Sequence, residues 1–219
     1  MTRIARNQAR VMLELQAGMN SKVESEWIAA RFPYLRAVVI EGAEAIEHHG
    51  WKWWKKQDRD LPQLQMELVD IWHFLLSELL LKNNGDHERA ADELLQVNSD
   101  VRTSIMFDGN DYDLTQLGLV RRLELLIGLS VARRIELILF RSIMADCHMD
   151  WNTLFRQYVS KNVLNFFRQD NGYKEGTYRK LWQGKEDNEH LVEVMALLDA
   201  EDPAYPDRLY QQLAQRYRA

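Results

Sequence analysis

The chain has 219 residues, of which 46% are hydrophobic, and its formal net charge is −5. The hydrophobic content is sufficient for a packed core, and the acidic charge argues against a general nucleic-acid-binding protein, which needs a basic face. Cys147 is the only cysteine, which excludes an intrachain disulfide and a cysteine-rich zinc site.

The N-terminal residues lack the apolar segment of a signal peptide. No apolar run reaches the roughly 18 residues that suggest a membrane span. We therefore expect a cytoplasmic protein that has neither a membrane nor a nucleic acid as a partner.

Only four prolines and ten glycines occur, and the apolar spacing predicts an all-α fold. In the first half, helices are expected at residues 3–19, ended by Asn20-Ser21, at 27–31, at 35–49, ended by Gly50, and from the N-cap Asp60 to Lys82. In the second half, they are expected at 86–96, at 115–149 with a break near Gly128, at 151–167, at 188–200 and at 206–217, with a loop at 107–113 and a polar segment at 170–187. We expect one domain over residues 1–219, in which about 86–150 is a more variable part, either a small subdomain or a dimer interface.

Two acidic signatures lie on consecutive expected helices. Glu41-Gly42-Ala43-Glu44 comes first, and Glu67-Leu68-Val69-Asp70 follows. A spacing of three residues puts both carboxylates of a pair on one helix face, about 5–6 Å apart at Cβ. Two such faces turned toward each other would offer four hard oxygen donors, which Mg²⁺ prefers.

A lone Glu-x-x-Glu pair is most often part of a solvated face, so its surroundings decide its meaning. On a helical wheel, Glu67 falls between Phe74 and Ile71, inside an apolar stripe. A buried carboxylate without a cation is costly, and the second pair therefore indicates a functional site. For His73, one turn from Asp70, a buried histidine with a satisfied hydrogen bond is favoured over a metal ligand.

The segment 51–56 is rich in tryptophan and lysine and has two interpretations. Trp51, Trp53 and Trp54 are either packing residues at a helix junction or a platform on which a base stacks. Taken alone, the sequence favours neither.

Basic and amide side chains recur between residues 161 and 188. Lys161, Asn165 and Arg168 are four and three residues apart, so they share one helix face, and Lys174 and Lys180 follow in a glycine-containing loop. Such donors suit the oxygens of a polyphosphate. The alternative is a solvated charged loop, against which the density of aromatic residues and glycines counts.

Five stretches, in this order, resemble the dimeric dUTPases of the all-α NTP pyrophosphatase superfamily. They are Leu15-Gln-Ala-Gly-Met-Asn20, Glu41-Gly-Ala-Glu44, Trp51-Lys-Trp-Trp-Lys55, Glu67-Leu-Val-Asp-Ile-Trp-His-Phe74 and Phe167-Arg-Gln-Asp-Asn-Gly-Tyr-Lys-Glu-Gly-Thr-Tyr178. The resemblance implies a homodimeric all-α helical bundle that hydrolyses dUTP to dUMP and pyrophosphate, and dUDP to dUMP and phosphate.

The resemblance also implies the site residues. Two or three Mg²⁺ ions, for which Mn²⁺ is a possible substitute, would be bound by Glu41, Glu44, Glu67 and Asp70. The phosphates would be held by Lys161, Asn165, Arg168, Tyr173, Lys174, Lys180 and Asn188. Gln16 and Asn20 would contact the uracil edge, with a tryptophan of the cluster, taken as Trp54, packed nearby. Glu44 is the candidate for the base that accepts a proton from the attacking water.

Two alternatives remain open from the sequence. A pyrophosphatase of the same superfamily that acts on dCTP or another nucleotide would share the carboxylates, because metal binding does not depend on the base. In a non-catalytic helical module, the acids would instead meet arginines across an interface, drawn from Arg36, Arg121, Arg122, Arg133 and Arg134.

Overall fold

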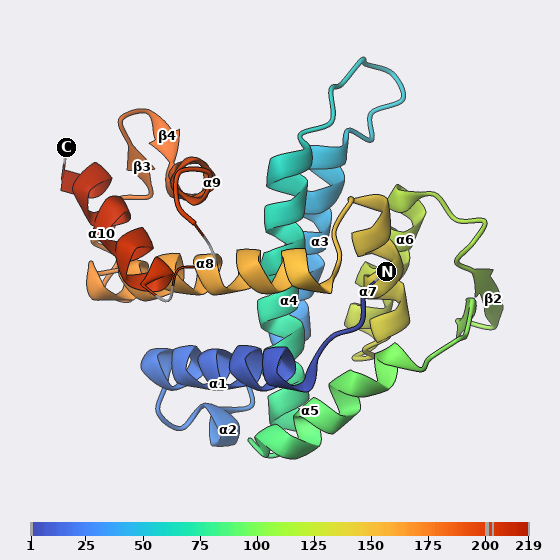
Figure 1. The fold of residues 1–219 in the computed structure, drawn as a ribbon. Helices are drawn as coiled ribbons and strands as arrows, with labels where there is room; N and C mark the ends of the chain where they lie inside the picture. Colours follow the sequence, from blue (N-terminus) through green and yellow to red (C-terminus); the bar gives the residue numbers. More distant parts are fainter. Residues whose placement is uncertain (1, 200–201, 203, 219) are drawn as a thin grey trace.

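Helix α4 (Leu61–Lys82) runs through the middle of the fold (Figure 1). Its sequence explains this position, since it is apolar on nearly every side and most of its residues are buried. Asp60 caps the helix by accepting a hydrogen bond from the Gln63 backbone, as the sequence predicts. The structure is a computed structural model, and it describes residues 2–199, 202 and 204–218.

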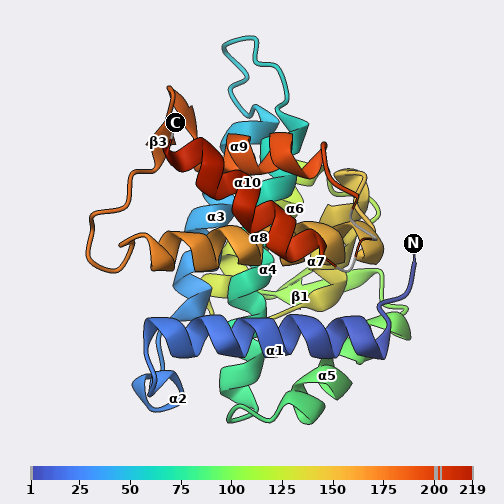
Figure 2. The ribbon, with the colours of Figure 1, turned by 60° about the vertical axis from the view of Figure 1, so that its left-hand side comes forward.

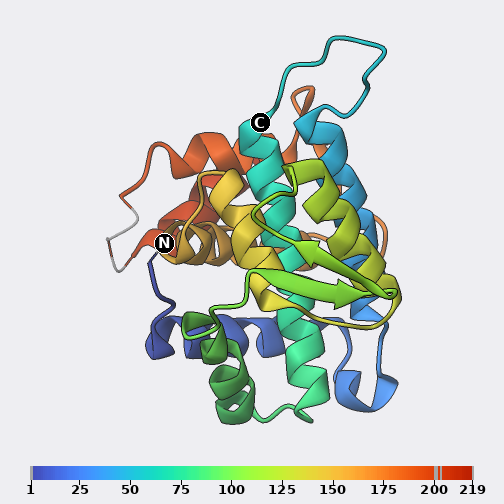
Figure 3. The ribbon, with the colours of Figure 1, turned by 90° about the vertical axis from the view of Figure 1, so that its right-hand side faces the viewer.

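Helix α3 (Tyr34–His49) lies alongside α4, and the loop that joins them projects beyond the rest of the molecule (Figures 1 and 3). Helices α1 (Arg6–Val23) and α8 (Trp151–Asp170) cross α4 at two levels (Figures 1 and 2). On the other side of α3, a Cβ added at Gly42 would meet Ile127 at 2.8 Å. The absence of a side chain there lets α6 (Leu119–Val131) pack closely on α3.

The remaining elements flank this centre. The short helices around it are α2 (Trp27–Ala30), α5 (His87–Leu95), the 3₁₀-helix η1 (Gln96–Asn98) and α7 (Leu137–Asp146). The chain ends with the strand pair β3 (Leu181–Trp182) and β4 (Lys185–Glu186) and the helices α9 (Asp187–Met195) and α10 (Tyr205–Arg218). These last elements have their own apolar cluster, in which Phe167, Trp182 and Leu209 are buried, next to the main core.

The all-α prediction is confirmed, and the strands of the described residues are short pairs. The expected loop at 107–113 is wrong, because strand β1 (Ser104–Phe107) pairs antiparallel with β2 (Asn110–Asp113) on the outer side of the molecule (Figure 3). Asp108 and Gly109 form the turn at φ of 47° and 74°. Asp-Gly is the pair that such two-residue hairpin turns prefer.

Three expected helix ends are also corrected. Asn20 does not end the first helix, because its buried side chain bonds to Gln16 and Ser77 and leaves its own backbone in the helix. The break in the long helical region falls after Val131, where Arg133 has a φ of 60°, and Gly128 lies inside α6. Helix α9 ends at Met195 rather than near residue 200. Among the described residues, no helix is long and apolar enough to cross a membrane.

Candidate active site

The acidic side chains of α3 and α4 converge. Ligand oxygens of Glu41, Glu67 and Asp70 all lie within 4.8 Å of one another. Glu44, one turn along α3, is exposed and lines the same cavity of about 660 Å³. His48, from the end of α3, also reaches this cavity, with its Nε2 3.6 Å from Glu67 Oε1.

The acids hold their protons to unusually high pH, chiefly because they are buried and also because they repel one another. Burial and the charge of Asp70 raise the pKa of Glu67 to about 8. Burial, together with Asp70 and Glu44, raises the pKa of Glu41 to about 7. A divalent cation would favour the ionised forms of both groups and displace their protons. The cluster is therefore a group of hard oxygen donors that fits a divalent metal.

Cationic side chains from α8 face the acids. Lys161 is 1% exposed, and its Nζ donates to Asp70 Oδ2 and Asn188 Oδ1, both at 2.7 Å. Arg168 donates from Nη1 to Asn165 Oδ1 at 3.1 Å. Lys180, from the loop before β3, pairs with Glu186 at 3.2 Å and lines the cavity. The cavity thus has an acidic wall next to a basic wall.

Asp187 is a site residue that the sequence patterns did not indicate. It is fully buried, and Arg168 donates to it twice, from Nε to Oδ2 and from Nη2 to Oδ1, at 2.8 Å each. Tyr178 donates its hydroxyl hydrogen to the same carboxylate at 2.9 Å. Burial alone would raise the pKa of Asp187, but these donors lower it. The only sequence signal is its position next to Asn188, at the first turn of α9.

A smaller, mostly apolar pocket of about 300 Å³ adjoins the charged cavity. Its inner wall contains the buried residues Gln16, Met19, Asn20 and His73, and Phe32 and Phe74 line it as well. Four residues line both spaces, namely Glu41, Asp70, Arg168 and Tyr173. The pocket therefore opens directly onto the charged cavity.

Two buried nitrogens of this pocket have no protein partner, Nδ2 of Asn20 and Nε2 of His73. Burial lowers the pKa of His73 to about 3, so its ring is neutral. His73 Nδ1 lies 2.7 Å from the carbonyl oxygen Oε1 of Gln16, so Nδ1 carries the hydrogen. Two residues that line the pocket thus carry an unpaired donor, Asn20 Nδ2, and an unpaired acceptor, His73 Nε2, both buried in its wall. The prediction that His73 is buried is confirmed, but its hydrogen bonding is only half satisfied.

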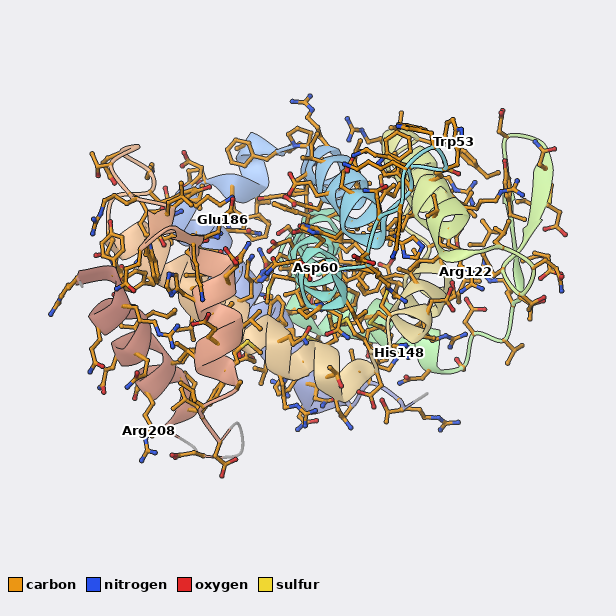
Figure 4. All side chains as sticks on the ribbon, turned by 90° about the horizontal axis from the view of Figure 1, so that it is seen from above. Trp53, Asp60, Arg122, His148, Glu186 and Arg208 are labelled. Atoms are coloured by element: carbon orange, nitrogen blue, oxygen red, sulfur yellow. The ribbon has the colours of Figure 1, made fainter. Side chains whose placement is uncertain are left out.

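Other predicted residues lie away from both spaces. Trp53 and Trp54 are 85% and 59% exposed on the loop between α3 and α4, and they pack against each other and Trp51. Viewed from above, Trp53 lies on the opposite side of Asp60 from Glu186 (Figure 4). Neither Trp54 nor Lys174 lines either cavity, and the Lys174 ammonium donates to the Val23 carbonyl at 2.9 Å.

Two of the five arginines of the alternative module have other partners. Arg122 pairs with Asp146, and Arg134 pairs with Glu136. The acid cluster instead meets Lys161 and His48.

A comparison with known proteins identifies the family of the chain. A family model described as dUTPase matches residues 8–173, which is more than half of the chain. The matched part includes Asn20, the four acids, His73 and the cationic face of α8. No curated protein matches the chain. The chain belongs to the dimeric all-α dUTPase family and is therefore a dUTP diphosphatase.

Proposed function

We propose that this site hydrolyses dUTP to dUMP and pyrophosphate in a Mg²⁺-dependent reaction, and that it also converts dUDP to dUMP and phosphate. The observation that carries the proposal is the pair of joined spaces. A pocket suited to a base, with one donor and one acceptor, opens onto a cavity that has carboxylates on one side and cations on the other. The pocket and the adjoining cavity therefore follow the order of a nucleotide, in which the base lies at one end and the polyphosphate at the other.

The metal would be held by Glu41, Glu67 and Asp70, with Glu44 at the rim. Carboxylate oxygens suit Mg²⁺, and Mn²⁺ accepts the same donors. When bound, such ions lower the pKa of a coordinated water and offset the charge of the phosphates.

The phosphates would be held by the basic wall. Lys161 is a buried cation and Arg168 a partly buried one. Their present partners are protein oxygens, and phosphate oxygens would compete for their hydrogens. Asp187 holds the guanidinium of Arg168 in a fixed plane, so that its remaining Nη1–H and the N–H groups now bonded to Asn165 and Asn188 point in defined directions. Further donors to the phosphates come from Asn165, Tyr173, Lys180 and Asn188, which line the two spaces, whereas Lys174 lies outside both.

Base selection follows from the two unpaired nitrogens. Uracil has an N3–H donor next to a carbonyl acceptor, so N3–H would meet His73 Nε2 and the carbonyl would meet Asn20 Nδ2. Cytosine has the reverse pattern on the same edge, because it carries an amino donor and an unprotonated N3. It would set donor against donor and acceptor against acceptor. A mismatch of buried polar groups is strongly discriminating.

Glu44 is the proposed general base. It is the exposed member of the acidic group and borders the cavity on the solvent side. A carboxylate in that position is accessible to a water that approaches the phosphate chain. It would accept the proton of that water.

We also propose that residues 1–219 act as a single catalytic domain and that the protein is a homodimer. The first proposal is supported by the origin of the site in α1, α3, α4, α8 and α9. The second is supported by membership of a dimeric family. The molar mass in solution, measured by light scattering, tests it: about 52 kDa is expected from a chain of 25.9 kDa.

The proposed function is tested by pyrophosphate release from dUTP, dCTP, dTTP and UTP, with Mg²⁺ and with a chelator. The highest kcat/KM is expected for dUTP, with no turnover in the chelator. A preference for dCTP would overturn the assignment of the base. Equal turnover in the chelator would overturn the metal dependence.

A further inference from the structure

Gln16 lies on the inner wall of the base pocket, yet its amide is engaged by protein at both ends. Its oxygen Oε1 accepts from His73 Nδ1 at 2.7 Å. It also shares the single hydroxyl hydrogen of Tyr158, at 3.0 Å, with the Met12 carbonyl at 2.9 Å. Its nitrogen Nε2 donates to Asn20 Oδ1 at 3.0 Å. The side chain is buried, with 4% of the residue exposed. Gln16 is therefore engaged with the two lining residues whose buried nitrogens have no protein partner.

These contacts determine which hydrogen-bonding groups Asn20 and His73 offer to a base. Because Asn20 Oδ1 accepts from Gln16, and also from the Ser77 hydroxyl at 3.2 Å, the Asn20 amide must turn its NH₂ group to the pocket. Because His73 Nδ1 donates to Gln16, the other ring nitrogen, Nε2, has no hydrogen and can only accept. Gln16 thus fixes both the donor at Asn20 Nδ2 and the acceptor at His73 Nε2.

The orientation of the Asn20 amide and the tautomer of His73 cannot change independently. If Asn20 turned over, its NH₂ group would face the NH₂ group of Gln16, so Gln16 would have to turn as well. A turned Gln16 would donate to His73 Nδ1, and the ring hydrogen would move to Nε2. The pocket would then present an acceptor at Asn20 and a donor at His73, which complements cytosine instead of uracil.

We propose that Gln16 is a positioning residue for base selection: it couples the orientation of Asn20 to the tautomer of His73, so that the pocket reads uracil without Gln16 itself contacting the base. This role presupposes the proposed function, in which this pocket receives the base. It differs from the sequence-based expectation that Gln16 contacts the uracil edge.

The test replaces Gln16 by a side chain of similar volume that cannot hydrogen-bond, Gln16→Met, and measures kcat/KM for dUTP and dCTP. Without the coupling, Asn20 and His73 can each adopt the orientation that the bound base requires. The dUTP/dCTP ratio is expected to fall at least about tenfold, and kcat/KM for dCTP is expected to rise above the wild-type value. If the variant only damaged the structure, kcat/KM would fall for dUTP and dCTP together. An unchanged ratio would overturn the proposal.

Tyr158→Phe is the matched control. It removes the hydroxyl that the Gln16 oxygen and the Met12 carbonyl share, but it leaves the connection from Asn20 through Gln16 to His73 intact. Its stability is expected to fall while the substrate ratio stays within about twofold of wild type. A fall in the dUTP/dCTP ratio as large as that in Gln16→Met would contradict the specific role of Gln16.

A measurement on the wild-type protein covers the case in which Gln16→Met does not fold. Long-range ¹H–¹⁵N spectra of histidine-labelled protein distinguish the two tautomers of His73. Hydrogen on Nδ1 is expected, and hydrogen on Nε2 in the free enzyme would overturn the proposal. Turnover by the wild-type enzyme distinguishes a failure of the proposed function from a failure of the role proposed for Gln16. No turnover of dUTP by wild type would refute the proposed function, whereas normal wild-type turnover with an unchanged ratio in Gln16→Met would refute only the role of Gln16.

Discussion

Lys161 and Asp70 form an ion pair across the floor of the charged cavity, with Nζ 2.7 Å from Oδ2. The lysine side chain is 1% exposed and the aspartate side chain 17%. The same ammonium lowers the pKa values of Glu41 and Glu67, although burial and the neighbouring carboxylates keep both raised. A cation that the phosphates would use is therefore also part of the electrostatics of the metal cluster.

Replacing Lys161 by methionine is expected to lower turnover but to tighten metal binding. The ammonium occupies Asp70 and repels a divalent cation, so its removal leaves a more negative cluster for the metal. At about pH 9, where protons compete least, we expect the Kd for Mg²⁺ to fall and kcat/KM for dUTP to fall at least about a hundredfold, because the phosphates lose a donor. Isothermal titration and steady-state kinetics measure the two effects.

Lys185→Met is the control for this variant, because Lys185 is exposed and pairs with Glu193 outside the cavity. It is expected to leave both values within about twofold. If Lys161→Met binds Mg²⁺ as wild type does, the influence of Lys161 on the acid cluster is refuted.

The raised pKa values also predict how the metal-free protein responds to pH. Glu41 and Glu67 have pKa values of about 7 and about 8 in the folded chain, against 4.5 when unperturbed. Between about pH 4.5 and 8 the folded state therefore binds more protons than the unfolded state, and its stability falls as pH rises. Mg²⁺ should reverse this trend, because it stabilises the ionised carboxylates and should raise the Tm more at pH 8 than at pH 6.

Thermal unfolding at several pH values, in chelator and in Mg²⁺, tests this prediction. The variant Glu41→Gln/Glu67→Gln should show a flatter dependence of Tm on pH, because its amides do not titrate. A Tm in chelator that rises from pH 5 to 8 would contradict the assignment.

The helical frame and the acidic cluster could be predicted from sequence because both depend on local spacing. The apolar surface of α4 indicated its central position, and the cap at Asp60 its start. The interval of three residues between Glu67 and Asp70 put them on one face. The β1–β2 hairpin was missed although Asp108-Gly109 is a turn signal, because its strands are only four residues each.

The parts that were missed depend on contacts between distant elements. Asp187 is important because Arg168, 19 residues earlier in another helix, donates to it. The free nitrogen of His73 follows from Gln16, 57 residues away. No local pattern encodes either relationship. Conversely, Trp54 belongs to a recognisable aromatic and basic segment, yet its loop holds it outside both cavities.

Replacing Asp187 by asparagine should impair phosphate binding more than chemistry. The variant leaves the Arg168 guanidinium with a neutral partner that can accept only one of its two hydrogen bonds, so its direction is no longer fixed. We expect KM for dUTP to rise about tenfold with a smaller fall in kcat, and stability to fall by about 3 kcal/mol because a buried charge loses its partner.

Tyr178→Phe provides the comparison for this position. It removes only the third hydrogen bond to Asp187 and leaves both bonds from Arg168. Its KM is expected to stay within about threefold of wild type. A KM for Asp187→Asn equal to that of wild type would show that Asp187 does not position Arg168 for substrate.

Asn20→Asp tests the donor in the base pocket directly. Its inner oxygen can still accept from Gln16 and Ser77, whereas its outer atom becomes an acceptor. The carbonyl of uracil would then face an oxygen, and kcat/KM for dUTP should fall at least about a hundredfold. The loss for dCTP should be smaller, because its amino group can donate to that oxygen. Equal losses for both nucleotides would place Asn20 outside base recognition.

Glu44→Gln tests the assignment of the general base. Glutamine has nearly the same shape but cannot accept a proton from water at neutral pH, so kcat should fall by about 10²–10⁴. Glu44 lies outside the cluster of Glu41, Glu67 and Asp70, so nucleotide binding should remain measurable. Single-turnover kinetics together with titration of a non-hydrolysable dUTP analogue separates the two quantities. A kcat within about tenfold of wild type would exclude Glu44 as the base, since loss of an essential proton acceptor acts on the chemical step.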